Sequence, residues 1–209
     1  MPSTRLRIAH IGLGDIARKA YLPLTTAHPG ITPLLCTRNE RVLEELAHQY
    51  RIKDAFNSLE ALITSRPDGA MIHTATDSHI DVATQLLRAG IPVFVDKPVS
   101  DSLTATEELF ALARRQNVAL FVGFNRRYAP LISSLRNGPT PHHVSWQKHR
   151  VNLPGEPRTF IFDDFIHVVD GLLFLADGKP EDLQVHARMD GEKMTSLQVQ
   201  WTADGALFS

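Results

Sequence analysis

A glycine-rich turn near the start of the chain limits most strongly what this sequence can fold into. Residues 12–17 read Gly-Leu-Gly-Asp-Ile-Ala and directly follow an apolar run at residues 6–11, which predicts a buried strand. A helical pattern covers residues 15–28, in which we expect Pro23 to tighten or kink the helix. Gly-x-Gly-x-x-Gly/Ala between a strand and a helix is typical of a phosphate-binding turn; the alternative is an ordinary tight turn.

Each small residue of this turn has a physical role in binding a dinucleotide. Gly12 makes the tight turn, Gly14 lets the backbone approach a pyrophosphate, and Ala17 lets the helix pack closely on the strand. The amides and the positive dipole at the start of the helix then hold the pyrophosphate. The motif predicts a nucleotide-binding site because it lies between the right elements.

The first 125 residues alternate between short apolar runs and amphipathic helical patterns. Further strands are predicted at residues 32–36, 54–56, 69–73, 92–95 and 118–122, and further helices at residues 39–50, 58–64, 78–89 and 102–116. Such alternation predicts an α/β fold with a doubly wound parallel sheet, a Rossmann domain that we place at residues 1–124.

The pattern changes after Gly123. A strand is predicted at residues 143–151, a helix at 163–176, and two strands at 183–188 and 195–202 with a turn between them at 189–192. We expect a second domain of the α+β class, with a mostly antiparallel sheet, at residues 125–209.

Charge and composition exclude several kinds of partner. The formal net charge of −1 gives no overall field that would attract nucleic acid or an anionic membrane. No run approaches the roughly 18 uninterrupted apolar residues that a membrane-spanning helix needs. Cys36 is the sole cysteine, which excludes an intrachain disulfide and suits a reducing compartment. We therefore expect no nucleic-acid partner, no membrane partner and a cytoplasmic location.

The end of the second predicted strand bears on the choice of cofactor. An acidic residue there would accept hydrogen bonds from the ribose 2′-hydroxyl of NAD and repel the 2′-phosphate of NADP. The chain has Thr37 and Arg38 instead, a hydroxyl donor and a guanidinium suited to binding phosphate. The missing acid favours NADP over NAD. The alternative is that Arg38 is an ordinary solvated side chain.

Two further polar clusters follow predicted strands. They are residues 74–79, which read Thr-Ala-Thr-Asp-Ser-His, and residues 96–98, which read Asp-Lys-Pro. Ligands of open α/β folds bind at the carboxyl edge of the sheet, where both clusters are expected to lie. Lys97 would place an ammonium group beside a bound nicotinamide, whereas an isolated lysine is usually a solvated surface residue.

Four segments in order resemble motifs of the Gfo/Idh/MocA oxidoreductases. Residues 96–98 resemble the family's Glu-Lys-Pro, and residues 89–93 are similar to the segment before it. Residues 123–130 resemble Gly-x-Asn-Arg-Arg-Phe-x-Pro, and residues 163–170 resemble the family's Asp-x-Gly-x-His-x-x-Asp helix. The resemblance covers essentially the whole chain.

The resemblance implies a hydride transfer between a nicotinamide cofactor and a hydroxyl-bearing carbon of a sugar-like or cyclitol substrate. Carried over, His167 is the general acid/base, Asp163 is its neighbour, and Lys97 stabilises charge on the reacting oxygen. In an α-helix the i,i+4 spacing would put Asp163 and His167 on one face. The alternative for His167 is a buried histidine with no catalytic part, and Asp170 is expected to be structural.

Several positions depart from the family pattern. Asp96 stands where the family has glutamate, Ala75 where proline is common, and Phe165 where glycine leaves space for substrate or nicotinamide. The sequence stops at Ser209 within a predicted strand, so we expect the second domain to be partial. The family's use of this sheet in dimers implies a homo-oligomer formed through the C-terminal sheet.

The candidate catalytic residues are Lys97, Asp163 and His167. The candidate residues for binding NADP or NAD are Gly12, Gly14, Asp15, Ile16, Ala17, Thr37, Arg38, Thr74, Ala75, Thr76, His79, Asp96, Lys97, Asn125 and Arg126. No metal site is expected, because the histidines at positions 142, 143 and 149 lack nearby carboxylates at ligand spacing.

Two other functions remain open. One is an NAD(P)-binding sensor or regulatory protein with weak or no catalysis, which Phe165 favours. The other is a redox-neutral enzyme that returns the hydride to the same substrate and retains its cofactor. Separately, Arg126 and its neighbour Arg127 are candidates for binding a phosphate of the substrate or cofactor; the alternative is that they form structural ion pairs.

Overall fold

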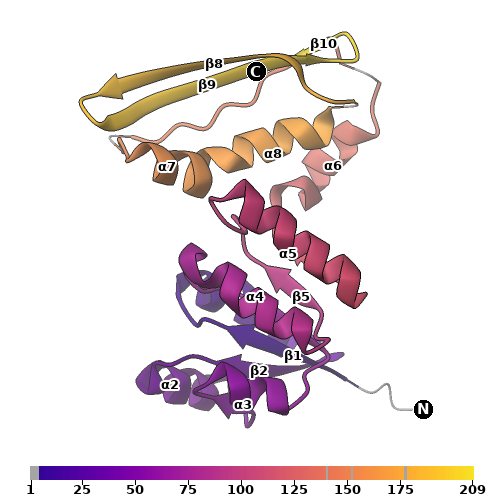
Figure 1. Cartoon of the computed structure of the whole chain (residues 1–209), viewed down its shortest axis with the longest axis vertical. Helices are drawn as coiled ribbons and strands as arrows, with labels where there is room; N and C mark the ends of the chain where they lie inside the picture. The colour runs from indigo at the N-terminus through magenta and orange to yellow at the C-terminus, as the bar shows by residue number, and fades with distance from the viewer. Residues whose placement is uncertain (1–4, 140, 152, 177) are drawn as a thin grey trace. The chain divides into compact units, whose positions relative to one another are not determined.

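The computed structural model describes residues 5–139, 141–151, 153–176 and 178–209. It divides the chain into two compact units, one ending at Gly123 and the other running from Phe124 to Ser209. Figure 1 shows the first unit in indigo to magenta and the second in the colours of the later residues. No helix of the described residues combines the length and the apolar character needed to cross a membrane.

The first unit is built on a six-stranded parallel sheet. Its strands are β1 (Leu6–Ile11), β2 (Ile31–Cys36), β3 (Ala55–Phe56), β4 (Gly69–Ile72), β5 (Val93–Val95) and β6 (Leu120–Val122). They pair in the order β3-β2-β1-β4-β5-β6, and every pairing is parallel. The chain changes direction across the sheet between β1 and β4, which is where open α/β folds bind ligands. The predicted Rossmann fold is therefore confirmed.

Helices cover both faces of this sheet. The α-helices after β2 to β5 are α2 (Glu40–Tyr50), α3 (Leu59–Thr64), α4 (His79–Arg88) and α5 (Leu103–Gln116). Side chains of Asn39, Ser58 and Ser102 accept hydrogen bonds from backbone amides in the first turns of α2, α3 and α5. These caps explain why the predicted helix starts lie within a residue of the observed ones.

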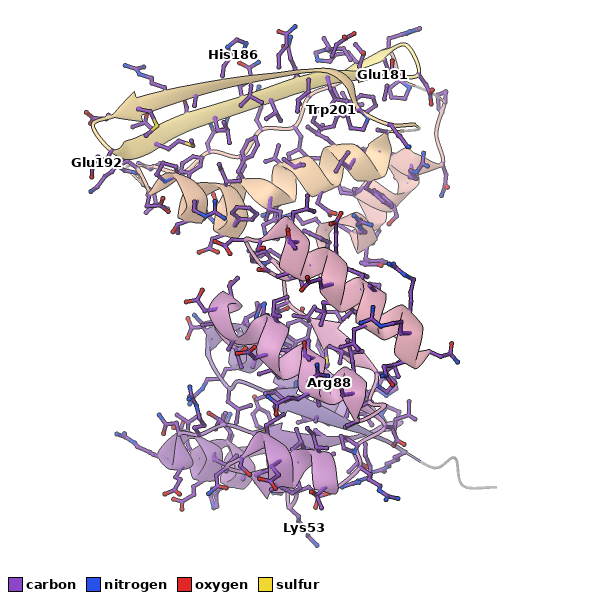
Figure 2. All side chains as sticks on the ribbon, in the orientation of Figure 1. Lys53, Arg88, Glu181, His186, Glu192 and Trp201 are labelled. Carbon is purple, nitrogen blue, oxygen red and sulfur yellow. The ribbon has the colours of Figure 1, made fainter. Side chains whose placement is uncertain are left out.

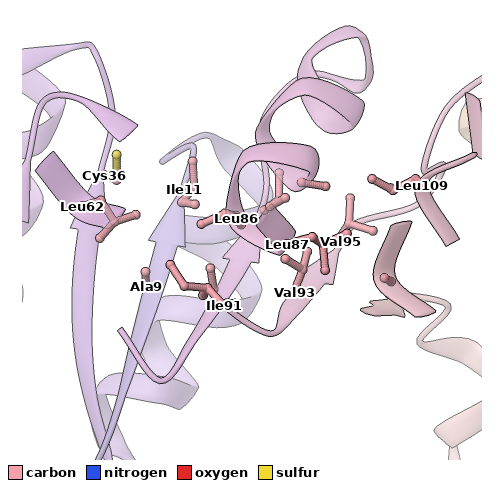
Figure 3. Close-up of a cluster of buried hydrophobic side chains, with 14 of the residues drawn as sticks. Ala9, Ile11, Cys36, Leu62, Leu86, Leu87, Ile91, Val93, Val95 and Leu109 are labelled. Carbon is pink, nitrogen blue, oxygen red and sulfur yellow. The ribbon is translucent and has the colours of Figure 1, made fainter. Parts of the chain in front are cut away.

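A large apolar cluster packs one face of the sheet against its helices (Figure 3). Leu86 and Leu87 of α4 contribute to it together with Ile11 and Val93 from the strands. Leu34 belongs to this cluster, whereas Leu35 belongs to a second cluster with Leu22 of the first helix. Consecutive residues of a strand point to opposite faces, so both faces of the sheet are buried.

The helix after the glycine turn differs from the single α-helix expected at residues 15–28. A π-helical turn, η1 (Ala17–Tyr21), leads into α1 (Leu22–Ala27). Pro23 has no N–H to donate, and its ring would clash with the carbonyl group four residues earlier in an α-helix. A wider π turn precedes Pro23, so the helix is distorted at this place but is not tightened as the sequence predicts.

The second unit contains a four-stranded sheet with one α-helix along its face. Its strands are β7 (His143–Val144), β8 (Glu181–Asp190), β9 (Lys193–Ala203) and β10 (Ala206–Phe208), in the order β7-β10-β9-β8. The β8–β9 and β9–β10 pairings are antiparallel, and β10 pairs with β7 in parallel. The sheet is mixed, with antiparallel pairings in the majority, as the sequence predicts.

The second unit also contains several short helices. They are η3 (Arg126–Tyr128), α6 (Pro130–Arg136), α7 (Pro157–Thr159), η4 (Phe160–Phe165) and α8 (Ile166–Leu175). Leu172 of α8 packs against Trp201 and Phe208 of the sheet. Figure 2 shows Trp201 between the sheet and α8, while Glu181 and His186 of β8 project from the sheet's other side. One side of this sheet thus forms a core with α8.

Two predictions for the second unit are wrong in detail. The strand expected at residues 143–151 is limited to β7, because it pairs only with Leu207 and Phe208 of the short strand β10. The helix expected at residues 163–176 begins with the π-helical turn η4 and becomes α-helical only at Ile166. The i,i+4 argument for a shared face at Asp163 and His167 requires an α-helix, so it does not apply here.

Candidate cofactor and catalytic site

The glycine turn lies against the end of a neighbouring strand. Gly12 has a φ of +85°, and a Cβ atom there would lie 2.7 Å from the backbone N of Thr74 and 2.8 Å from the carbonyl carbon of His73. The amide of Gly12 donates to the carbonyl of Cys36 over 3.0 Å. Only glycine fits this position, because the ends of β1, β2 and β4 converge on it.

The second glycine faces open space. A Cβ atom on Gly14 would have no neighbouring heavy atom within 4 Å. Ala17 is fully buried, as expected for the small residue that packs the helix on the sheet. Gly14 therefore leaves the room beside the backbone that a pyrophosphate needs, and the turn fits a dinucleotide.

The residues between these small positions point outward. Ile16 is 44% exposed, and Asp15 forms an exposed ion pair with Lys19 over 2.6 Å. The hydrogen bond from Lys19 lowers the pKa of Asp15. These two predicted cofactor residues can approach a ligand through their backbone amides at the start of the helix.

The end of β2 carries the two residues that bear on the choice between NAD and NADP. The Thr37 hydroxyl oxygen accepts a hydrogen bond from the Asn39 amide over 3.3 Å. Arg38 is exposed. Cys36 is buried, and burial raises the pKa of its thiol to about 11. The arrangement leaves the guanidinium of Arg38 accessible from solvent beside the glycine turn.

The loop after β4 is tied to the loop after β5. Thr74, Ala75 and Thr76 lead into the 3₁₀ turn η2 (Thr76–Ser78), where the Ser78 hydroxyl donates to the hydroxyl oxygen of Thr74 over 2.8 Å. His79 is 1% exposed. Its ring nitrogens lie 2.9 Å from the carbonyl oxygen of Thr74 and 2.8 Å from that of Pro98. His79 therefore holds the two loops together.

Asp96 and Lys97 follow β5 at the same edge of the sheet. The Asp96 amide donates to the carbonyl of Ile72, and a cis peptide bond joins Lys97 to Pro98. The two Asp96 carboxylate oxygens accept hydrogen bonds from the hydroxyl of Tyr21 over 3.0 Å and from Nδ1 of His73 over 2.8 Å. Lys97 is partly buried. The first unit thus brings the glycine turn, residues 74–79 and Asp96-Lys97 to one edge.

A buried polar network continues behind Asp96. His10 and His73 lie in the sheet layer, and the Nδ1 atom of His10 is 3.3 Å from Nε2 of His73. Nε2 of His10 is 2.9 Å from the hydroxyl oxygen of Thr25. Burial, and then His73, lower the pKa of His10 to about 3. Burial, and then Asp96, raise the pKa of Tyr21.

The sequence reasoning missed this network. His10 lies within the apolar run at residues 6–11, and His73 directly follows the run at residues 69–72. A histidine in such a place must find a polar partner when it is buried, and this could have indicated the network. Their contact requires the pairing of β1 with β4, in which Ile11 lies beside Ile72. Nothing in the linear pattern gives that pairing.

The second unit holds the other two candidate catalytic residues. Asp163 is exposed in η4, and His167 is partly buried in the first turn of α8. Lys97 belongs to the first unit, so the convergence of these three residues stays a prediction. Phe165 packs against the apolar cluster under the sheet. That packing gives its side chain a structural role in the core of this unit.

Two groups of ion pairs hold the helical segments η4 and α8, which carry Asp163 and His167. Asp164 pairs with Lys148 and with Arg150, and the hydrogen bond from Arg150 lowers the pKa of Asp164 to about 2. Asp170 is 6% exposed and pairs with Arg127. The structural expectation for Asp170 therefore agrees with its burial and its pairing.

The segment after Gly123 contains the last predicted cofactor residues. Asn125 is exposed and Arg126 is partly buried. The guanidinium of Arg127 also lies 5.7 Å and 5.4 Å from the ring centres of Phe124 and Phe174. Of the arginine doublet, Arg127 is thus committed to the core of the second unit.

Within the described residues, no group of three or more histidine, cysteine or acidic side chains could hold a metal ion. His143 lies 3.2 Å from the hydroxyl of Ser209, and His149 lies 3.2 Å from the side-chain oxygen of Gln147. The partners of these two histidines are thus a hydroxyl and an amide oxygen, which are not metal-ligating carboxylates.

The sheet order and the glycine turn define a Rossmann-type protein. Residues 6–124 match the model of the family described as "Oxidoreductase family, NAD-binding Rossmann fold", and the chain belongs to these Gfo/Idh/MocA oxidoreductases. The resemblance seen in the four sequence motifs is thereby confirmed.

Individual relatives and structures agree with this assignment. The chain is 39% identical over 179 residues to "Putative oxidoreductase YceM" of Salmonella typhimurium, which covers 83% of this chain and 57% of YceM. It is 33% identical over 132 residues to "Myo-inositol dehydrogenase Hyg17" of Streptomyces leeuwenhoekii, covering 63% of this chain and 40% of Hyg17.

A crystal structure of a Gfo/Idh/MocA family oxidoreductase from Vibrio cholerae superposes with a TM-score of 0.90 and 41% identity. The superposition covers 97% of this chain and 67% of that one. The chain thus spans little more than half the length of the first curated relative, and about two thirds of this structure.

Proposed function

We propose that this protein is an NAD(P)-dependent dehydrogenase that acts on a hydroxyl-bearing carbon of a sugar-like or cyclitol substrate. The observation that carries the proposal is the meeting of the Gly12 turn, the loop at residues 74–79 and Asp96-Lys97 at one edge of a parallel sheet. The names of the relatives support the substrate class, since Hyg17 is named as a myo-inositol dehydrogenase.

The first unit has the features that a nicotinamide dinucleotide requires. The turn at residues 12–17 would hold the pyrophosphate, with Gly12 closing the turn and Gly14 leaving space. Thr37 and Arg38 would bind the 2′-phosphate of NADP in preference to the bare ribose of NAD. The loop at residues 74–79 and Asp96-Lys97 would line the nicotinamide half. When bound, the nicotinamide supplies the hydride acceptor or donor.

The chain's own residues would handle the hydroxyl group. Lys97 would donate a hydrogen bond to the reacting oxygen and stabilise the negative charge that develops there. His167 would take the hydroxyl proton or return it, because an imidazole can both accept and donate a proton. Asp163 would orient the imidazole or bind a substrate hydroxyl. We assign Asn125 and Arg126 to cofactor binding as well.

The cofactor is tested by titrating the protein with NADPH and NADH and following nicotinamide fluorescence. NADPH should bind more tightly, and Arg38→Ala should weaken NADPH by about ten- to a hundredfold, as expected for losing charged hydrogen bonds. Arg41→Ala, an exposed arginine of α2, is the matched control. Equal affinities for both cofactors that Arg38→Ala leaves unchanged would exclude the NADP preference.

The chemistry is tested with a panel of sugars and cyclitols and the reduction of either cofactor. Lys97→Ala and His167→Ala should abolish most turnover while cofactor binding persists. Lys53→Ala, which projects from the surface of the first unit in Figure 2, should keep wild-type turnover. Undiminished turnover in both active-site variants would refute the assignment of these residues.

A redox-neutral enzyme is distinguished by the purified protein itself. Such an enzyme would retain nicotinamide absorbance through purification and show no net cofactor reduction. Phe165 favours the sensor alternative, and this side chain is partly buried against the apolar cluster of the second unit. The presence of Lys97, Asp163 and His167 favours the dehydrogenase, which we keep as the proposed function. A reducing cytoplasm suits the single buried Cys36.

We also propose that the protein forms a homo-oligomer through the C-terminal sheet. Every residue of the edge strand β8 is exposed, including Leu183 at 61% and Val185 at 56%. Exposed apolar side chains on an edge strand are a typical site of association between chains.

A further inference from the structure

A continuous chain of polar side chains runs from the first helix of the Rossmann unit to Asp96. It starts at Thr25, passes through His10 and His73, and ends on one carboxylate oxygen of Asp96, with contacts of 2.9, 3.3 and 2.8 Å. The hydroxyl of Tyr21 donates to the other carboxylate oxygen over 3.0 Å. The rings of Tyr21 and His73 also stack, with centres 4.3 Å apart.

The network is buried where a Rossmann sheet is otherwise apolar. His10 and the side chain of His73 are 0% exposed, and the Asp96 side chain is 15% exposed. Burying such groups costs free energy unless each polar atom finds a partner, and an apolar core of the same shape is often at least as stable. The fold alone therefore gives no reason for placing two histidines and a carboxylate here.

The contact with Asp96 has a defined direction of hydrogen bonding. A carboxylate only accepts, so Nδ1 of His73 donates to Asp96. Behind it, Nε2 of His73 lies 3.3 Å from Nδ1 of His10, and Nε2 of His10 lies 2.9 Å from the Thr25 hydroxyl oxygen. That hydroxyl donates to the carbonyl of Tyr21 over 3.0 Å. His10 is neutral because burial lowers its pKa to about 3. The ring of His73 is thus held between Asp96 and His10.

We propose that Tyr21 and His73 are positioning residues that hold the Asp96 carboxylate in one orientation, and with it the adjacent Lys97 at the cofactor edge. His10 and Thr25 support this arrangement from behind, because His10 contacts His73 and Thr25 contacts His10. The inference rests on the proposed function, in which Lys97 acts on the reacting oxygen.

The physical basis is the short connection between the two residues. Asp96 directly precedes Lys97, and its amide is already fixed by the carbonyl of Ile72. Once both carboxylate oxygens are held as well, the backbone that leads into Lys97 has little freedom. Asp96 also stands where the family has the longer glutamate, so Tyr21 and His73 reach a carboxylate drawn closer to the strand.

The first test compares variants that remove or keep a single donor. Tyr21→Phe deletes only the hydroxyl, His73→Phe deletes the ring donor, and His73→Asn keeps a donor near the Nδ1 position. Both phenylalanine variants should lower kcat by roughly ten- to a hundredfold, as when a catalytic group is misplaced by about 1 Å, with KM for the cofactor changed far less. His73→Asn should recover part of kcat.

Two controls separate positioning from general destabilisation. Leu86→Ala removes fully buried apolar contacts from the same unit and should lower the melting temperature while leaving kcat unchanged. In an Asp96→Asn background, His73→Phe should have a much smaller effect on kcat than in the wild type, because its action passes through Asp96. If His73→Phe lowers kcat by the same factor in the Asp96→Asn background as in the wild type, the proposal is overturned.

The hydrogen-bond direction is tested without any turnover. Nitrogen-15 NMR of the histidine side chains in the full chain at about pH 8, where an ordinary histidine is neutral, should show His73 protonated at Nδ1, the atom that donates to Asp96. A His73 ring without a proton on Nδ1 would overturn the network. An active wild type with unchanged Tyr21→Phe and His73→Phe would overturn positioning alone, whereas a wild type with neither cofactor binding nor turnover would overturn the proposed function.

Discussion

The two glycines of the phosphate-binding turn constrain the molecule in different ways. A Cβ on Gly12 would lie 2.7 Å from the Thr74 amide nitrogen, whereas a Cβ on Gly14 would meet no atom within 4 Å. Gly12 is therefore required by the fold, and Gly14 by whatever enters the open space.

Alanine substitutions should separate these requirements. Gly12→Ala should destabilise the protein by about 1–3 kcal/mol, the usual cost of a strained backbone position, and also weaken cofactor binding. Gly14→Ala should leave the melting temperature unchanged and still weaken NADPH binding. Thermal unfolding and fluorescence titration of both variants check this pair, and a Gly14→Ala protein with wild-type affinity would contradict it.

The buried His10 should give the protein a pH-dependent stability. The pKa of His10 falls from 6.5 to about 3 on folding, so between these values the unfolded chain binds a proton that the folded chain does not. The free energy of unfolding is therefore unaffected by His10 above pH 6.5 and decreases progressively as the pH falls toward 3. The free energy of unfolding should change with pH by up to about 1.4 kcal/mol per pH unit in this range.

Urea unfolding at steps from about pH 7 to about pH 4 measures this slope. His10→Asn, which cannot titrate, should flatten it. His186→Asn, an exposed position on β8, should retain the wild-type slope. Equal slopes in all three proteins would show that the buried histidine does not control acid stability.

Local chemistry at single residues was readable from the sequence where one motif held all of it. Gly12, Gly14 and Ala17 occupy the predicted places because the turn is contiguous in the chain. The partners of Asp96 were not readable. They come from a π-helical turn and from the residue after β4, which meet Asp96 only when the sheet is assembled.

At the scale of elements, each of the two π-helical turns in the described residues leads directly into an α-helix. Tyr21 closes η1 and contacts Asp96, and η4 leads into the helix of His167. Apolar spacing cannot distinguish a π turn from an α turn over five or six residues, so the sequence predicted uniform α-helices. Strand β10 was missed because three residues are too few to show alternation.

The helix α8 should depend on one buried ion pair. Asp170 is 6% exposed, and removing its partner with Arg127→Leu leaves a buried carboxylate without a cation. We expect a loss of about 3–5 kcal/mol in the free energy of unfolding, measured by chemical denaturation.

An exposed arginine of the same unit is the matched comparison. Arg150 has a side chain that is 53% exposed, and its partner Asp164 keeps Lys148 when Arg150 is removed. Arg150→Ala should therefore cost about 1 kcal/mol or less. Similar losses in Arg127→Leu and Arg150→Ala would contradict the importance of burial.

At the scale of the molecule, the alternating pattern was enough to predict the sheet of the first unit, because each strand–helix pair is local. The strand order followed from the predicted fold class, because no residue pattern specifies it. The division of labour between a cofactor domain at residues 1–124 and a substrate domain at 125–209 remains our proposal.

Association through the second sheet is testable on one strand. Val185 and His186 are neighbours on β8 and point to opposite faces. Val185→Lys should shift the protein to smaller species in light scattering across a range of concentrations, and His186→Lys should leave the distribution unchanged. A wild type that is monomeric throughout would exclude this interface.

The buried thiol of Cys36, at the end of β2, can be used to measure local unfolding of the Rossmann unit. Cys36 is 4% exposed and packs in the apolar cluster beside Leu62. A thiol reagent can reach it only during excursions that part the sheet from its helices, and no second cysteine competes for the label. The labelling rate, compared with that of the unfolded chain, therefore gives the free energy of those excursions at a single known atom. Slower labelling with a nucleotide present would measure how far the ligand suppresses them.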